Sequence, residues 1–254
     1  MACHYCYFLT QNKGKARCLT LEQLKRAVDL WISYTKPVNL KGLSTELTRV
    51  RKIELVGGEP FLNFPLLRDI VGYIRYRAGE TMDVSVYTNG SLMTKDRVRY
   101  LLDQQINLVI SLDGGKGTTD LNRKFCGNPG KSVFDTVMAG LDRLPREYIH
   151  RMYAGVTSTS ETIGSLVNDA KFLVGLGFRE IFLDLDMLEI WPPEKIGELH
   201  RALRGLKDYY VSLLGERGSP YRANKVYSFG FNDKLKPRDM SCVTDEITLG
   251  PDGG

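Results

Sequence analysis

The feature that most constrains the fold of this chain is an alternation of short apolar runs with longer amphipathic segments. Five apolar runs are each followed by a helical pattern, which after the third run is preceded by a long glycine-rich loop. The predicted strands are Lys52–Val56, Asp83–Thr88, Asn107–Leu112, Arg151–Val156 and Glu180–Asp184. Strands that alternate with helices favour parallel pairing through right-handed crossovers. Near-continuous apolar strands are typical of a sheet covered by helices. The chain is therefore predicted to be an α/β protein, barrel-like in preference to a doubly wound open sheet.

Polar and glycine-containing motifs follow four of these strands. They are Gly57-Gly58-Glu59-Pro60, Thr88-Asn89-Gly90, Ser111-Leu112-Asp113-Gly114 and Thr157-Ser158-Thr159. In both architectures ligands bind at the carboxyl ends of the strands, so the motifs are expected to share one rim. The first motif offers backbone that a ligand can approach closely, because glycine has no Cβ, and Glu59 suits an ammonium group. The alternative for this motif is a tight strand-to-helix turn with Pro60 near the helix start.

A close cysteine pair lies at the N-terminus, in Cys3-His4-Tyr5-Cys6. By itself such a pair fits a zinc half-site, a redox dithiol or an iron–sulfur loop. A zinc site would need a second pair, which the isolated Cys18, Cys126 and Cys242 do not form, and a thioredoxin-like dithiol would follow a strand. The odd number of five cysteines argues against a disulfide framework and predicts a reducing, cytoplasmic setting.

Charge and hydropathy exclude two classes of partner. The formal net charge is +5, and the only dense basic stretch, residues 13–17, has no interleaved aromatic side chains. No nucleic-acid partner is therefore expected. No segment reaches the roughly 18 consecutive apolar residues of a membrane helix, and the N-terminus lacks the pattern of a secretory signal. No membrane association is expected either.

Taken together, the cysteine loop and the ordered Gly-Gly-Glu-Pro, Thr-Asn-Gly and Ser-Leu-Asp-Gly motifs resemble the radical S-adenosylmethionine (SAM) superfamily. The branch that is most similar modifies peptides and includes the anaerobic sulfatase-maturating enzymes. The resemblance implies a partial (β/α)6 barrel with a [4Fe–4S] cluster held by three cysteines. The fourth iron would bind SAM, which reduction would cleave to a 5′-deoxyadenosyl radical. It also implies a peptide or protein substrate and an electron donor of the flavodoxin or ferredoxin type.

The resemblance assigns roles to single residues. Cys3 and Cys6 match two of the cluster ligands, and Tyr5 matches the aromatic residue near the adenine. The remaining matches are to SAM itself: Gly57, Gly58, Glu59 and Pro60 for the amino group, Ser111 and Asp113 for the ribose and carboxylate, Arg123 of Asp120-Leu-Asn-Arg123 for the carboxylate, Thr157 and the backbone near Leu188 for ribose and adenine, with Thr88 and Asn89 lining the pocket. The alternatives are a solvent-facing loop for Arg123 and a strand-to-turn cap for Thr88 and Asn89.

Two departures from the family pattern stand out. The first cluster cysteine should lie four residues before Cys3, and the barrel strand that normally precedes the loop is absent, so a truncated N-terminus is expected. Asp113 is followed by Gly114-Gly115, where the family often has Gly-Pro.

The C-terminus resembles the opening of a SPASM extension, which binds auxiliary [4Fe–4S] clusters, and makes Cys242 a candidate ligand. The chain is thus predicted to comprise a radical SAM core at residues 1–215, followed at 216–254 by a linker and the start of that extension. The alternatives are a degenerate barrel that binds SAM or a peptide without a competent cluster, and a zinc-binding interaction domain.

Overall fold

The computed structural model describes residues 1, 3–6, 19–34, 52–186, 188–215 and 246–248. These residues form a curled sheet of six parallel strands in the order β5-β4-β3-β2-β1-β6. The strands are β1 (Lys52–Leu55), β2 (Asp83–Thr88), β3 (Asn107–Ser111), β4 (Tyr153–Ser158), β5 (Glu180–Leu185) and β6 (Glu246–Thr248). Because every pair is parallel, the carboxyl ends of the strands lie at one rim. The predicted α/β fold with a partial barrel is confirmed.

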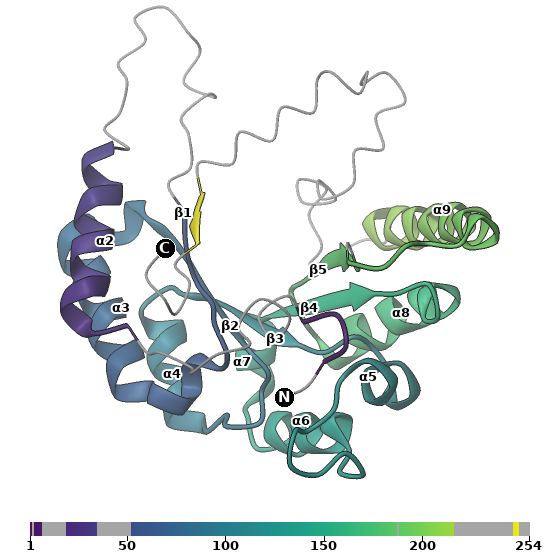
Figure 1. Ribbon diagram of the computed structural model, residues 1–254, viewed down its shortest axis with the longest axis horizontal. Helices are drawn as coiled ribbons and strands as arrows, with labels where there is room; N and C mark the ends of the chain where they lie inside the picture. The colour runs from purple at the N-terminus through teal and green to yellow at the C-terminus, as the bar shows by residue number, and fades with distance from the viewer. Residues whose placement is uncertain (2, 7–18, 35–51, 187, 216–245, 249–254) are drawn as a thin grey trace, which may run out of the picture.

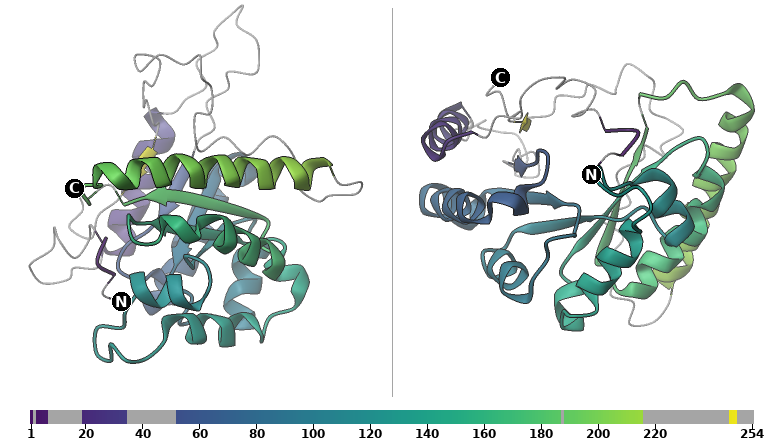
Figure 2. Two further views of the ribbon diagram at one scale, coloured as in Figure 1. Left: turned by 90° about the vertical axis from the view of Figure 1, so that its right-hand side faces the viewer. Right: turned by 60° about the horizontal axis from the view of Figure 1, so that its bottom comes forward.

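Helices line the outer side of the curled sheet (Figures 1 and 2). The α-helices are α2 (Leu21–Tyr34), α3 (Phe64–Ala78), α4 (Lys95–Asp103), α5 (Lys116–Asn122), α6 (Val133–Leu141), α7 (Arg146–Ile149), α8 (Leu166–Leu176) and α9 (Pro193–Gly215). The short 3-10 turns within the described ranges are η2 (Pro60–Asn63), η3 (Gly79–Thr81) and η4 (Ile163–Ser165). None of the helices in the described ranges combines the length and apolar character needed to cross a bilayer.

Local sequence explains why α3 forms and where it ends. Asn63 is its N-cap and accepts a hydrogen bond from the backbone N of Leu66, and Gly79 follows its last turn. Its buried residues, Leu67, Ile70, Val71 and Ile74, follow the spacing of one helix face. They pack into the same core as Val84 and Val86 of β2 and Leu108 and Ile110 of β3. Burial of each such side chain contributes about 1.5–3 kcal/mol.

Two predicted boundaries are corrected. The sequence predicted a long glycine-rich loop after the third strand, but residues 116–122 form α5. Asn122 donates to Thr157 O at 3.2 Å and Thr118 donates to Asp169 Oδ2 at 2.8 Å, and these contacts with distant elements stabilise the helix. The fourth strand was expected at Arg151–Val156 and runs from Tyr153 to Ser158. The strand begins later because the short helix α7 and a turn precede it. Arg151 closes this turn by donating from its backbone N to Tyr148 O. Thr157 therefore lies within β4, paired in register with Asp184 of β5.

The C-terminal strand joins the same sheet. Helix α9 ends at Gly215, where the sequence predicted the boundary of the core, and β6 pairs with the side of β1 opposite β2. Residues 246–248 of the predicted second unit thus contact the core directly, with Ile247 beside Ile53 in register. The other residues of that unit, Cys242 among them, lie outside the described ranges, and the division into two units stays a prediction.

Candidate functional site

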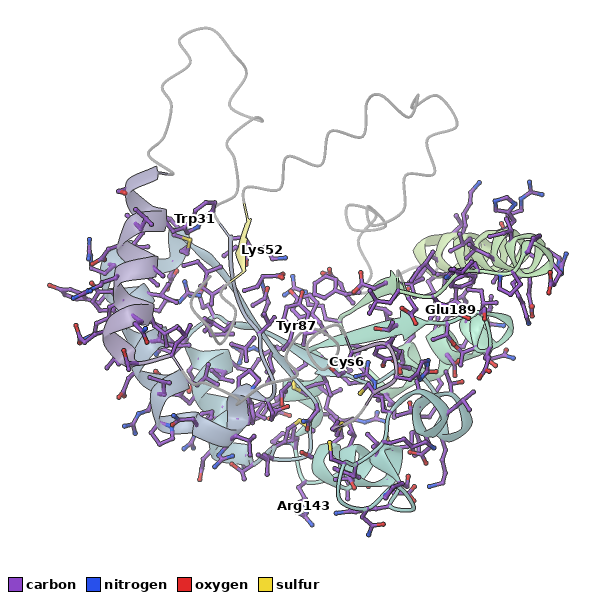
Figure 3. All side chains as sticks on the ribbon, viewed as in Figure 1. Cys6, Trp31, Lys52, Tyr87, Arg143 and Glu189 are labelled. Atoms are coloured by element: carbon purple, nitrogen blue, oxygen red, sulfur yellow. The ribbon has the colours of Figure 1, made fainter. Side chains whose placement is uncertain are left out.

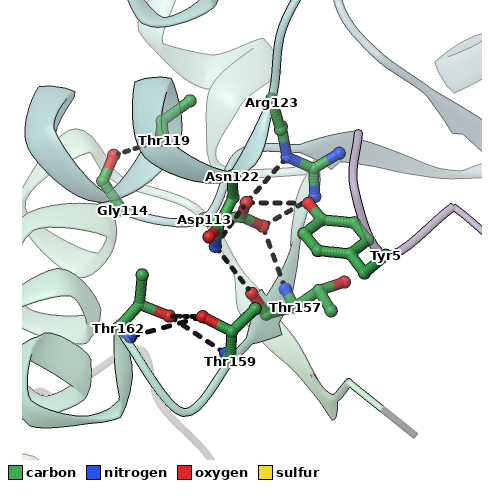
Figure 4. Close-up of polar contacts among 9 residues, drawn as sticks. All are labelled: Tyr5, Asp113, Gly114, Thr119, Asn122, Arg123, Thr157, Thr159 and Thr162. Carbon is green, nitrogen blue, oxygen red and sulfur yellow. Dashed lines mark hydrogen bonds and ion pairs between the residues drawn. The ribbon is translucent and has the colours of Figure 1, made fainter. Parts of the chain in front are cut away.

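The Asp113 carboxylate is the centre of a buried hydrogen-bond cluster at the rim (Figure 4). The residue is 1% exposed and follows the end of β3. Arg123 donates to both oxygens, from Nε to Oδ2 at 2.9 Å and from Nη2 to Oδ1 at 2.6 Å. Asn122 Nδ2 donates to Oδ2 at 3.3 Å, and the backbone N of Thr157 donates to Oδ1 at 2.9 Å. Paired, charge-assisted donors of this kind are what allow a carboxylate to be buried.

A fifth donor connects this cluster to the cysteine loop. Tyr5 Oη donates to Asp113 Oδ2 at 2.8 Å, and the Arg123 guanidinium lies over the Tyr5 ring, 5.4 Å from its centroid. The loop itself is a tight turn in which Cys6 N donates to Cys3 O at 3.1 Å, and both cysteines are half-buried. The structure therefore brings together Tyr5, Asp113 and Arg123, which the sequence predicted separately.

Burial and charge set the protonation of this cluster. Burial raises the pKa of Tyr5, against the Arg123 charge, and keeps the phenol protonated as a donor. Burial by itself would lower the pKa of Arg123. The charge and hydrogen bonds of Asp113, together with Tyr5 and Cys3, raise that pKa above its ordinary value, so the guanidinium stays charged. Burial also raises the pKa of Cys3, against the same positive charge. Without a metal the Cys3 thiol is thus protonated at neutral pH, and a metal would have to displace that proton.

A second cluster surrounds Glu59 at the ends of β1 and β2. Its Oε1 accepts from the backbone N of Phe61 at 3.0 Å and from Thr88 Oγ1 at 2.6 Å, and its Oε2 accepts from the backbone N of Asn89 at 2.7 Å. Glu59 is the N-cap of η2, and burial raises its pKa although each of these bonds lowers it. Three predicted residues are thus neighbours. The strand-to-helix turn that was the alternative for Gly57-Gly58-Glu59-Pro60 is present, and Thr88 and Asn89 donate hydrogen bonds to its Glu59. An ammonium ligand for Glu59 stays a prediction.

The other predicted rim residues lie at strand ends without side-chain roles of their own. Gly57 and Gly58 are exposed after β1, and Gly57 has a φ of +155°, which L side chains rarely adopt. Pro60 begins η2, and Ser111 ends β3 beside Gly155 of β4. Their contacts with SAM stay predictions.

A pocket of about 340 Å³ opens between the cysteine loop and the ends of β4 and β5. Its lining residues are His4, Leu121, Thr159, Glu161, Asp186, Leu188 and Glu189. Leu188, predicted as a ligand contact, is 57% exposed, and its backbone N donates to Asp186 Oδ1 at 2.9 Å. His4 and Leu188 therefore face one cavity.

Sequence reasoning missed Asn122 and Asp169. Asn122 directly precedes Arg123 and donates to Thr157 O at 3.2 Å as well as to Asp113. Asp169 of α8 is 6% exposed and accepts from Gly115 N and Thr118 Oγ1, both at 2.8 Å. A signal for it existed, since this carboxylate lies on the apolar face that includes Leu166, Ala170 and Leu173.

Asp169 leads to a prediction about pH. Burial raises its pKa and the bonds from Gly115 and Thr118 lower it by less, so the folded state binds this proton more tightly than the unfolded state. The stability that Asp169 contributes is thus present at low pH and lost as the pH rises through its folded pKa. Asp169→Asn keeps an acceptor for Gly115 and has no proton to lose. As the pH rises from about 4 to 7, the unfolding free energy of this variant should therefore increase relative to that of the wild type.

Asp169→Ala is the matched comparison. It leaves the Gly115 N–H without its acceptor and should cost about 1–3 kcal/mol at both pH values. Urea unfolding at the two pH values measures both variants. Equal pH dependence in Asp169→Asn and the wild type would contradict the assignment.

The described residues match the implied cluster only in part. Cys3 and Cys6 share one turn, whereas Cys126 is exposed on another loop. Within the described ranges, no group of three or more His, Cys, Asp or Glu side chains is arranged to hold a metal ion. Cys242 is outside those ranges. Of the three thiolates that the resemblance implies, the described residues could supply two, those of Cys3 and Cys6, and their role as ligands stays a prediction.

The family model of the radical SAM superfamily matches residues 1–173. The chain belongs to the radical SAM superfamily. The predicted membership is thus confirmed.

Relatives and solved structures extend this finding. The chain is 27% identical over its whole length to a probable GTP 3′,8-cyclase of Methanopyrus kandleri, of which it covers 75%. It is 26% identical to a serine-type anaerobic sulfatase-maturating enzyme of Bacteroides thetaiotaomicron, over 73% of this chain and 41% of the relative. The structure of native anSMEcpe with bound AdoMet matches with a TM-score of 0.60 and 19% identity, over 84% of this chain. The chain spans 57% of that structure's length, and the likeness supports the fold.

Proposed function

We propose that the protein binds SAM at the rim and, with a [4Fe–4S] cluster, cleaves it reductively to a 5′-deoxyadenosyl radical that modifies a peptide or protein side chain. The observation that carries the proposal is the hydrogen bond from Tyr5 to Asp113. This bond joins the cysteine loop to Asp113, one of the strand-end residues to which the resemblance assigns SAM binding. The bound cluster would supply the electron for SAM cleavage.

The chain's own residues would position SAM. Cys3 and Cys6 would bind iron as thiolates, which burial opposes and the Arg123 charge favours. Arg123 holds Asp113 with Nε and Nη2, so its remaining Nη1 edge would meet the SAM carboxylate. The exposed backbone of Gly57 and Gly58 would bind the amino group, and the pocket lined by His4 and Leu188 would take the nucleoside.

The similarity to a sulfatase-maturating enzyme supports a peptide or protein substrate. The similarity to a probable GTP 3′,8-cyclase, which covers this whole chain, favours a second candidate, a nucleotide substrate. In either case we propose a flavodoxin- or ferredoxin-type electron donor and a cytoplasmic location. We also propose that Cys242 ligates an auxiliary [4Fe–4S] cluster.

Anaerobic reconstitution tests the proposal. The full-length protein, in which a cysteine is predicted four residues before Cys3, should bind near-stoichiometric cluster iron and, with dithionite and SAM, release 5′-deoxyadenosine, whereas its Cys3→Ala/Cys6→Ala variant should release none. Peptides with serine or cysteine and, separately, GTP should be supplied, because the true substrate class should raise the yield.

Absence of both iron and 5′-deoxyadenosine would contradict the proposal in favour of the degenerate barrel. Zinc at Cys3 and Cys6 would favour the zinc-binding alternative instead.

A further inference from the structure

We propose that Tyr5 is a positioning residue whose phenol fixes the cysteine loop to the barrel through Asp113. This inference rests on the proposed function for its meaning in catalysis, but its geometry is independent of any cofactor. Within the described parts of the chain, the 2.8 Å bond from Tyr5 Oη to Asp113 Oδ2 is the one side-chain hydrogen bond that joins residues 3–6 to the barrel. The ring stacks edge-on against His4 within the same loop.

Asp113 is a rigid anchor that does not depend on Tyr5. Its carboxylate is held by Arg123 and Asn122 from the end of α5 and by the backbone N of Thr157 in β4. Figure 4 shows these donors around the carboxylate. Asn122 and Arg123 are buried and Thr157 is part of β4, so we expect the anchor to stay in place when the phenol is removed. The position of the cysteine loop therefore depends on Asp113, whereas the position of Asp113 does not depend on the loop.

The position of the two thiols, Cys3 and Cys6, follows from this placement of the loop. Tyr5 lies between Cys3 and Cys6, and the turn between them is closed by the bond from Cys6 N to Cys3 O at 3.1 Å. A loop tied at Tyr5 keeps the Cys3 thiol close enough to Arg123 and Asp113 to interact with both charges, and the turn keeps Cys6 beside Cys3. When the tie is lost, the loop retains the stacking of Arg123 over the Tyr5 ring and can open more often.

Tyr5→Phe tests the proposal because it removes the hydroxyl and keeps the ring beside Arg123. In the full chain without metal, iodoacetamide should alkylate Cys3 and Cys6 about tenfold faster in this variant, the ratio expected when one hydrogen bond to a carboxylate is lost. Peptide mapping by mass spectrometry resolves each site, and the exposed Cys126 is the internal reference. The matched control is Tyr100→Phe, which removes a phenol that donates to Arg68 O on distant helices at 3.0 Å.

Unchanged rates at Cys3 and Cys6 in Tyr5→Phe would overturn the proposal. Faster alkylation in Tyr100→Phe, or at Cys126 as well, would also overturn it, because it would show general loosening.

A second readout uses the reconstituted protein. At equal iron content, the electron paramagnetic resonance spectrum of reduced Tyr5→Phe should differ from that of the wild type once SAM is added, and identical spectra would contradict a positioning role. The alkylation assay needs neither cluster nor SAM, so its failure and a failure of SAM cleavage are separate results.

Discussion

Replacing Arg123 by alanine is expected to lower the free energy of unfolding by about 3–5 kcal/mol, the cost of leaving a buried charge without its partner. The Asp113 side chain is 0% exposed and that of Arg123 is 8% exposed. Arg123→Ala removes both bonds that the guanidinium donates to the carboxylate, at 2.6 Å and 2.9 Å, and leaves the buried Asp113 charge without its cation. Urea unfolding followed by circular dichroism measures the loss.

Two comparisons show whether the charge is the cause. Arg143→Ala removes an arginine that is exposed and points away from the barrel (Figure 3), and should change stability by no more than about 0.5 kcal/mol. Adding Asp113→Asn to Arg123→Ala should recover part of the loss, because the uncompensated charge is then gone. A loss below about 1 kcal/mol in Arg123→Ala would show that the pair is not the structural centre of the rim.

Gly114→Ala is expected to cost about 3 kcal/mol or more. The φ of Gly114 is +146°, a conformation that costs other residues about 1–3 kcal/mol. An added Cβ would lie 2.1 Å from Asp169 Oδ1, so the buried carboxylate would have to move and release Gly115 N. The loss of that bond adds about 1–3 kcal/mol.

Gly117→Ala is the control for this prediction. Gly117 lies three residues on in the first turn of α5, and an added Cβ there meets no atom within 4 Å. The substitution should be neutral or should stabilise by up to about 1 kcal/mol, because alanine favours the helix. Equal thermal unfolding midpoints for the two variants would contradict the role assigned to Gly114.

Much of the fold could be predicted because its signals are local. The apolar runs and the caps are properties of neighbouring residues, so the five strands from Lys52 to Leu185 lie close to their predicted bounds. Parallel pairing then follows from the helices between them. Helix α5 was missed because the glycines at 114, 115 and 117 oppose a helix locally, and the contacts that stabilise it come from distant elements.

The partners of single side chains were harder to predict. Asp120, which shares the Asp-x-x-Arg spacing with Arg123, instead accepts from Ser132 Oγ at 2.6 Å and from Phe134 N at 2.9 Å, at the start of α6. Arg123 binds Asp113, ten residues away. The spacing of a motif indicates which residues are near the site, but it does not indicate which side chains meet.

The sequence by itself determined the family, the parallel sheet and the rim at which the motifs lie, because periodicity, glycine positions and motif order are all written along the chain. Only the tertiary structure decided that Tyr5 meets Asp113, 108 residues away, that Glu59 closes a turn with Thr88 and Asn89, and that Asp169 supports the loop after Asp113. These contacts depend on where separate elements bring a buried carboxylate and its donors. A buried charge takes whichever donors the packed core places within reach, and local sequence does not encode that distance.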